Sequence, residues 1–149
     1  MTPTRGERSN NPGNINYLPR SPWRGQVGRE QGAPNPRFGL YDDAENGIRA
    51  IGKQLLAYQQ RDGLRTISAL INQWAPPADR NDTSAYVKAV SASVGVLPLV
   101  PVDLAEHTVL AKIVTAIIVQ ENGRCVYAPN LIETACRDAI GIPQGAAAA

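Results

Sequence analysis

Val109-Leu-Ala-Lys-Ile-Val-Thr-Ala-Ile-Ile-Val-Gln-Glu-Asn-Gly123 is the stretch that decides the fold. Its apolar residues recur at helical spacing and cover a wide face, which is typical of a helix at the centre of a helical domain. The spacing predicts that this helix, the longest of the chain, opens at Asp103 and runs to about Glu121, where Asn122-Gly123 supplies the stop. Lys112 interrupts the apolar run, which is also too short to span a bilayer.

The same periodicity predicts four further helices, each bounded by capping or helix-breaking residues. Aspartates or a threonine supply the helix starts, whereas glycine and proline follow the helix ends. These predicted helices are Asp42 or Asp43 to Asp62, Thr66 to Trp74, Asp82 or Thr83 to Gly95, and Pro129 to Ile140.

Residues 1–41 carry many turn formers and few periodic apolar positions. Asn10-Asn-Pro-Gly-Asn14 predicts a tight turn, because proline fixes φ while glycine and asparagine tolerate positive φ. Short extended pieces are expected at Ile15–Tyr17, Gln26–Val27 and Phe38–Tyr41. The predicted fold class is mainly α, with about five helices and a small N-terminal lobe of β-structure and loops. We expect one domain over residues 1–143 and a disordered tail at 144–149.

The composition is that of an ordinary soluble globular protein, 43% hydrophobic and 19% charged over 149 residues. A net charge of +2 is too small to argue for nucleic acid. A basic segment nevertheless precedes the first long predicted helix, with arginines at Arg5, Arg8, Arg20, Arg24, Arg29 and Arg37. Such a segment suits an anionic polymer or a membrane surface, although a solvated face is the simpler interpretation.

Metal and thiol chemistry are not expected. Cys125, Cys136 and the single His107 are too few for a zinc site, which needs four ligands or three and a water. Nothing around them resembles a cysteine–histidine nucleophile motif. Whether the cysteines pair in a disulfide or stay as two buried thiols is open, and no cofactor is predicted.

Glu121 is the candidate catalytic residue. It lies at the end of an apolar helix, where the negative end of the helix dipole and partial desolvation both favour the neutral acid over the carboxylate. A carboxyl group that keeps its proton near neutral pH is what cleavage of a glycosidic bond requires. A solvated glutamate near a helix end is the simpler interpretation of this residue taken alone.

A series of motifs runs through nearly the whole chain: Arg5-Gly-Glu-Arg-Ser-Asn-Asn-Pro-Gly-Asn-Ile15, Trp23-Arg-Gly25, Phe38–Tyr41, Gly47-Ile-Arg-Ala50, Trp74-Ala-Pro-Pro77, Asn81-Asp-Thr-Ser-Ala-Tyr86 and Gln120-Glu-Asn-Gly123. Together they resemble a family of small phage and prophage virion-associated proteins, several of which are regarded as lysozyme-like cell-wall hydrolases. The resemblance implies a lysozyme-like fold and partners that include peptidoglycan and other virion proteins. Nucleic acid is not an expected partner. It also implies a protein that is virion-associated, or cytoplasmic before release, and acts in the periplasm or cell wall. Residues 1–20 are polar and lack the apolar region of a secretory signal, so we expect a virion, a holin or a secretion apparatus to deliver it.

The motif order is also similar to that of flagellar and autolysin-type glucosaminidases. Those enzymes begin with a helix that ends in the catalytic glutamate, and an Asn-rich segment, a Trp-x-Gly and a Tyr-bearing segment follow. Here the later elements keep that order, from Asn11 to Tyr86, whereas the glutamate helix comes last as Ile117–Gly123. The pattern resembles a circular permutation, which requires chain termini that lie close together.

The resemblance implies that Glu121 is the acid. Glu7 is the alternative, since in more familiar lysozyme-like enzymes the acid precedes the Asn-rich turn. Glu7 or Asp82 would supply a second carboxylate, although a lytic transglycosylase needs only one glutamate. Tyr86 corresponds to a tyrosine that lines the sugar site, and Trp74 is expected in the core. The candidate substrate-binding residues are Tyr86, Asn11, Asn14, Trp23, Asp82 and Thr83.

The predicted function is therefore that of a lytic transglycosylase or glycan-strand glycosidase that acts on peptidoglycan. The alternatives are a non-catalytic structural virion protein with the same fold, a peptidoglycan endopeptidase, and a nucleic-acid-binding role for the basic N-terminal segment.

Overall fold

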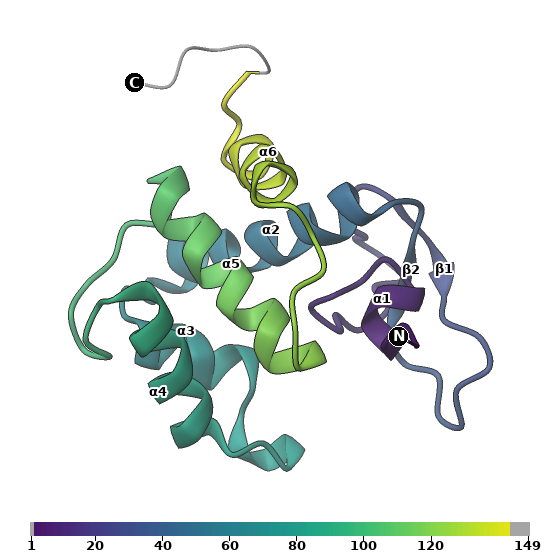
Figure 1. Ribbon diagram of the computed structural model, residues 1–149, viewed down its shortest axis with the longest axis horizontal. Helices are drawn as coiled ribbons and strands as arrows, with labels where there is room; N and C mark the ends of the chain where they lie inside the picture. Colours follow the sequence, from purple (N-terminus) through teal and green to yellow (C-terminus); the bar gives the residue numbers. More distant parts are fainter. Residues whose placement is uncertain (1, 144–149) are drawn as a thin grey trace.

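Helices dominate the computed structural model, which describes residues 2–143 (Figure 1). In chain order the elements are α1 (Arg5–Arg8), β1 (Gln26–Arg29), β2 (Gly39–Tyr41), α2 (Ala44–Asp62), α3 (Ile67–Trp74), the 3-10 turn η1 (Pro77–Asp79), α4 (Thr83–Val94), α5 (His107–Asn122) and α6 (Pro129–Ile140). The prediction of a mainly α fold is confirmed. A single domain over residues 1–143 stays a prediction, and the tail predicted at 144–149 lies outside the described residues.

Helices α2, α3, α4 and α6 begin and end within a residue of their predicted bounds. The side chains of Asp43, Thr66 and Asp82 each accept a hydrogen bond from the backbone N–H three residues on, which satisfies a donor that the first helical turn leaves unpaired. Gly95 ends α4 with a φ of 80°, a left-handed conformation that glycine adopts without a steric penalty.

Helix α5 begins at His107, so the predicted start at Asp103 was wrong. The Asp103 carboxylate accepts from the backbone N–H of Ala105 at 2.9 Å, and the Asp103 carbonyl accepts from that of Glu106 at 3.2 Å. A separate turn therefore closes before the helix starts. With 16 residues, α5 is also shorter than the 19 residues of α2, so it is not the longest helix.

The core is built around α5, as its apolar face predicts. Helix α5 contacts α4 and α6 most extensively and touches α1 and α2 as well (Figure 1). Its large inward residues have at most 1% exposure; they are Leu110, Ile113, Val114, Ile117 and Ile118. Helix α6 lies mainly on α2. Residues 42–143 thus form one apolar body, called the helical half below.

The N-terminal lobe, residues 2–41, contains little regular structure. Strands β1 and β2 pair antiparallel, with an irregularity in register between Gln26 and Gly28. The predicted extended piece Ile15–Tyr17 contributes one isolated bridge, Asn16 to Phe38, instead of a strand. The predicted turn at Asn10–Asn14 is confirmed, since both of its end asparagines have positive φ, 51° and 50°.

The N-terminal lobe packs directly against α2 at Gly47. A Cβ atom at this position would lie 1.7 Å from the backbone oxygen of Asn10. Only a residue without a side chain permits two backbones to approach so closely. Glycine at position 47 therefore fixes the distance between the lobe and the helical half.

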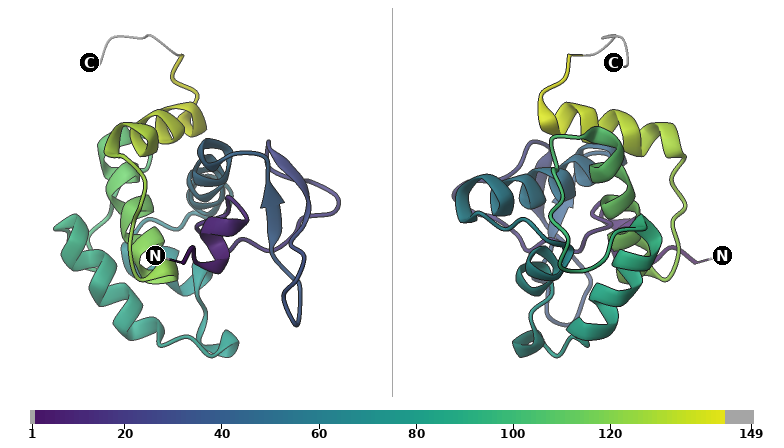
Figure 2. Two further views of the ribbon diagram at one scale, coloured as in Figure 1. Left: turned by 45° about the vertical axis from the view of Figure 1, so that its right-hand side comes forward. Right: turned by 90° about the vertical axis from the view of Figure 1, so that its left-hand side faces the viewer.

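The N-terminal segment contacts the end of α5 and not the end of α6. The Thr4 hydroxyl donates to the side-chain oxygen of Asn122 at 2.6 Å, and the Asn122 amide donates to the Pro12 carbonyl at 2.8 Å. In all three views the end of α6 lies on another side of the molecule (Figures 1 and 2). Helix α1 and its turn thus contact the end of α5, and the circular permutation inferred from motif order stays a prediction. Within residues 2–143, no helix combines the length and the apolar character needed to cross a membrane.

Candidate functional site

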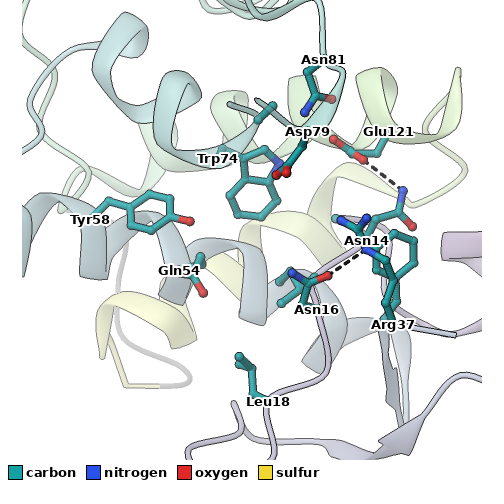
Figure 3. A pocket seen from close by; sticks show the side chains of 14 residues that line it. Asn14, Asn16, Leu18, Arg37, Gln54, Tyr58, Trp74, Asp79, Asn81 and Glu121 are labelled. Carbon is teal, nitrogen blue, oxygen red and sulfur yellow. Dashed lines mark hydrogen bonds between the residues drawn. The ribbon is translucent and has the colours of Figure 1, made fainter. Parts of the chain in front are cut away.

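A pocket of about 330 Å³ opens between the N-terminal lobe and the helical half (Figure 3). This volume is within the range of sites that bind small molecules, roughly 300–1,000 Å³. The lobe supplies one wall through residues 13–16, Leu18, Arg37 and Phe38, and α2 supplies the floor through Gln54 and Tyr58. The opposite wall consists of Trp74, Ala75, Asp79, Asn81 and Glu121.

Glu121 lies in this wall and is held at both carboxylate oxygens. The side-chain amide of Asn14 donates to Oε1 at 3.0 Å, and the Tyr86 hydroxyl donates to Oε2 at 2.8 Å. Burial and the negative charge of Glu121 both raise the pKa of Tyr86, so its hydroxyl keeps its proton and remains a donor. Three predicted site residues, from the N-terminal turn, α4 and α5, thus meet at one carboxyl group.

The N-terminal turn positions Asn14 for this contact. Asn14 adopts a φ of 50°, and its backbone N–H donates to the Asn11 carbonyl at 3.0 Å. The bond from Asn122 to Pro12 fixes the same turn to the last turn of α5. Asn122 directly follows Glu121 in the sequence. The end of α5 therefore carries the carboxyl group and, through Asn122, also holds the turn that places Asn14 beside that group.

Glu7, the alternative acid, lies outside the pocket lining and forms an ion pair. Its carboxylate accepts from Arg124 at 2.6 Å and from the backbone N–H of Thr4 at 3.0 Å, and its side chain is 8% exposed. The bond from Arg124 holds the pKa of Glu7 below its usual range. A general acid needs the opposite shift. The structural role of Glu7 is instead to close the capping box of α1.

Four predicted substrate-binding residues have structural partners and do not line the pocket. Asn11 has no exposed surface, and its side chain bonds the backbones of Ile15 and Gly39. Asp82 caps α4, and the Thr83 hydroxyl donates to the Ala75 carbonyl at 2.5 Å. The Trp23 indole N–H donates to the side-chain oxygen of Gln54 at 3.3 Å. Of the predicted set, Glu121 and Asn14 line the pocket, and Tyr86 reaches it through Glu121.

Several lining residues were missed by the sequence reasoning. Trp74, expected in the core, is only partly buried and forms a pocket wall against Gly13. Asp79 and Asn81 follow it in the segment that joins α3 to α4. The sequence did carry a signal for this segment, because it lies between two of the motifs, Trp74–Pro77 and Asn81–Tyr86. The local spacing alone gave no reason to fold it towards Glu121.

The polar lining is mostly uncharged. Four side-chain amides face the pocket, those of Asn14, Asn16, Gln54 and Asn81, and they can both donate and accept hydrogen bonds. The lining acids are Glu121 and Asp79, and the lining cation is Arg37. Trp74, Tyr58 and Phe38 add aromatic surface. This mixture suits a polar, ring-shaped ligand that carries amide groups. Within residues 2–143, no three histidine, cysteine, aspartate or glutamate side chains gather as a metal ion would need, and both cysteines are free thiols.

The fold and pocket define a class of small, mainly helical proteins with a glutamate at the junction of a helical half and an N-terminal lobe. No model of a known protein family matches the chain. It is similar, however, to Protein P5 of Pseudoalteromonas phage PM2, with 32% identity over 127 residues, which cover 83% of this chain and 74% of the phage protein. The chain belongs to the family of this phage protein.

Proposed function

We propose that the protein is a peptidoglycan-degrading enzyme, a lytic transglycosylase or glycan-strand glycosidase that works with a phage particle or prophage and opens the cell wall locally. The observation that carries the proposal is the meeting of Glu121, Tyr86 and Asn14 at one pocket wall. A glycosidase site needs a carboxyl group that is held in one orientation beside a cavity with room for a sugar ring.

In the proposed reaction Glu121 acts first as the acid. Its proton passes to the glycosidic oxygen as the bond to the anomeric carbon breaks, and the carboxylate that remains is held by Tyr86 and Asn14. In a transglycosylase the sugar's own hydroxyl then attacks the anomeric carbon and returns its proton to Glu121, which leaves an anhydro ring. In a hydrolase a water molecule takes the place of that hydroxyl.

The lining amides and the Trp74 ring support a sugar substrate of the N-acetylated kind. An acetamido group carries one N–H and one carbonyl, which side-chain amides such as Asn16 and Asn81 can pair with. An indole beside the cavity offers a flat apolar face to the ring carbons of a sugar. The proposed arrangement is lysozyme-like, with the glutamate helix placed after the lobe that it serves instead of before it.

Membership of a phage protein family supports the proposed setting. A phage needs to pass the peptidoglycan layer, and a small wall-degrading protein carried in its particle would serve that step. The same membership is compatible with a virion protein that keeps this fold without catalysis, which is the competing proposal.

Digestion of purified sacculi with the wild-type protein tests the proposal. We expect clearing in a zymogram and, by mass spectrometry, either anhydro-muramyl ends from a transglycosylase or new reducing ends from a hydrolase. Freed amines without glycan products would instead indicate an endopeptidase. A folded protein that releases no product would contradict the enzymatic proposal and leave the structural one.

A further inference from the structure

Arg37 is the positively charged side chain in the lining of the Glu121 pocket. Its guanidinium lies over the Phe38 ring, 5.0 Å from the ring centroid, and its Nε donates to the side-chain oxygen of Asn16 at 3.1 Å. Stacking and the hydrogen bond hold one edge of the guanidinium against the lobe wall. The remaining N–H groups are left for another acceptor, because Arg37 is exposed.

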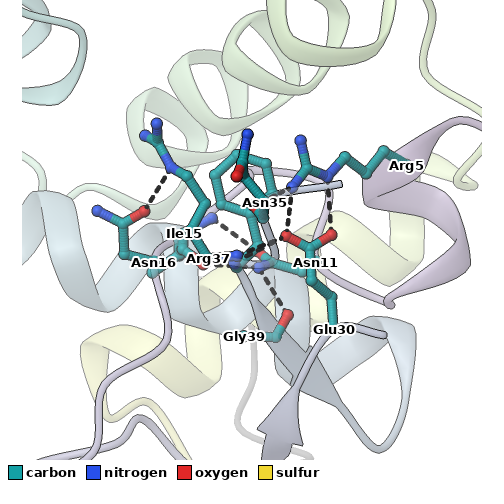
Figure 4. A network of polar contacts seen from close by, with 9 residues as sticks. Arg5, Asn11, Ile15, Asn16, Glu30, Asn35, Arg37 and Gly39 are labelled. Atoms are coloured by element: carbon teal, nitrogen blue, oxygen red, sulfur yellow. Dashed lines mark hydrogen bonds and ion pairs between the residues drawn. The ribbon is translucent and has the colours of Figure 1, made fainter. Parts of the chain in front are cut away.

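The charge of Arg37 is not neutralised by a carboxylate in the part of the chain that the structure describes. The nearby carboxylate, Glu30, is engaged elsewhere (Figure 4). Glu30 accepts two bonds from Arg5, at 2.7 and 2.5 Å, and two more from the backbone N–H groups of Arg37 and Phe38. The Arg37 side chain extends away from Glu30 towards Asn16 (Figure 4).

The two acids of the pocket come from the opposite wall. Asp79 and Glu121 belong to the helical half, whereas Arg37 belongs to the lobe (Figure 3). An anionic substituent on a bound ligand is repelled by Asp79 on the helical wall and attracted by Arg37 on the lobe wall. The pocket therefore favours one orientation for a ligand that carries a single negative group.

We propose that Arg37 binds a carboxylate on the substrate, so that the enzyme prefers glycan strands with carboxylated substituents over neutral ones. This inference rests on the proposed function, since it concerns the substrate of the same pocket. Guanidinium groups bind carboxylates through two parallel N–H donors, which fixes the geometry as well as the charge.

In peptidoglycan such a carboxylate has two sources. Strands without peptides carry a free lactyl carboxylate on each muramic acid. In strands with peptides the lactyl group is amidated, and the carboxylates belong to the peptide stem. Both present the same chemistry to Arg37, and separate substrates distinguish them.

Initial rates on defined strands test the inference. The substrates are peptide-bearing strands, peptide-free strands, and both strands after their carboxyl groups are converted to neutral methylamides. The proteins are the wild type, Arg37→Gln, and Arg29→Gln as a matched control. Arg29 is also exposed and stacks on an aromatic ring, Tyr17 at 4.8 Å, but it does not line the pocket.

We expect Arg37→Gln to raise the KM for a carboxylated substrate roughly three- to tenfold, as for an exposed charge-assisted bond, with little change in kcat. On the methylamides it should match the wild type, and Arg29→Gln should match the wild type on every substrate. The strand on which the effect appears identifies the source of the carboxylate.

An equal loss on carboxylated and neutral strands would overturn the inference and leave the proposed function intact. If the wild type cleaves none of the strands, the proposed function fails instead. Calorimetric binding of the same strands to the Glu121→Gln protein, with and without Arg37→Gln, then still measures the carboxylate contact. Equal affinity for carboxylated and neutral strands in that measurement would also overturn the inference.

Discussion

The two regions of the molecule are held together by different forces. In the helical half, apolar side chains such as Ile51, Leu55 and Ile117 have no exposed surface, so burial of hydrocarbon supplies the stability. The lobe buries only Ile15 and Tyr41 among its large apolar residues. It depends instead on buried polar groups, with Asn11 and Glu30 each bonded several times. The pocket lies where the apolar body and the polar lobe meet. Glu121 comes from a helix of the apolar body, and its partner Asn14 comes from the hydrogen-bonded turn of the lobe.

The largest effect on stability is expected from Ile117→Ala in the helical half. Ile117 has no exposed surface, and the truncation leaves a cavity in the middle of α5, which should lower the free energy of unfolding by about 3–4 kcal/mol. Chemical denaturation measures the change. Ile15→Ala in the lobe, at 7% exposure, is the paired variant and should lose less. A larger loss of stability for Ile15→Ala than for Ile117→Ala would contradict the conclusion that apolar burial stabilises mainly the helical half.

Glu30→Gln examines the polar lobe and is expected to lower stability by about 2–3 kcal/mol at pH 7. Arg5, with the two backbone bonds, holds the pKa of Glu30 at about 2, below its ordinary 4.5. A depressed pKa stabilises the fold above pH 4.5, and that contribution of about 3 kcal/mol is lost as the pH falls from 4.5 towards 2. The free energy of unfolding of the wild type should therefore fall as the pH is lowered through this window, and that of the variant should fall much less. Parallel acid curves would show that Glu30 does not carry the effect.

Gly47→Ala changes the contact between the lobe and α2. The new Cβ would lie 1.7 Å from the Asn10 carbonyl, so a backbone must move, and we expect a loss of about 2 kcal/mol despite the better helix propensity of alanine. Hydrogen exchange should quicken in residues 9–16 before it changes in α5. Gly52→Ala is the matched control on the same helix, because its Cβ would meet side-chain carbons and no backbone atom: one of Ala139 at 3.1 Å and one of Leu110 at 3.5 Å. Equal losses of stability for the two substitutions would contradict a specific role for the backbone contact at Gly47.

Tyr86→Phe has the smallest expected effect and affects the site more than the fold. It removes the hydroxyl that donates to Glu121 at 2.8 Å, and one such bond contributes about 1 kcal/mol to stability. We expect the cleavage rate to fall roughly tenfold, since the carboxyl group loses one of its two fixed partners. Steady-state kinetics beside a thermal melt separate the two effects. An unchanged rate would show that Tyr86 does not orient the acid.

Sequence periodicity predicted the helical half well, because burial there follows a local rule. The spacing of apolar residues, with caps at Asp43, Thr66 and Asp82, placed four helices within a residue of their bounds. Helix α5 was misplaced only at its start, where the Asp103 side chain closes a competing turn. The helix α1 was missed, since its four residues carry no periodic signal.

The site was only partly predictable, because its contacts join residues far apart in the chain. Glu121 and Tyr86 were found from motif order, and Asn14 from the turn. Asn11 was misread, since an asparagine in a turn can face a ligand or bond the backbone, and only tertiary packing decides. The lining by Asp79 and Arg37 depends on how two loops fold over α2, which no local pattern records.

The most direct test of the central claim is the rate at which Glu121→Gln protein cleaves purified peptidoglycan. The substitution keeps the shape of the side chain and removes its proton-donating carboxyl group. Glu106→Gln, an exposed position just before the start of the same helix, is the control. We predict at least a roughly hundredfold loss for Glu121→Gln with an unchanged circular dichroism spectrum, and wild-type rates for the control. A folded Glu121→Gln protein that cleaves peptidoglycan at the wild-type rate would contradict the account.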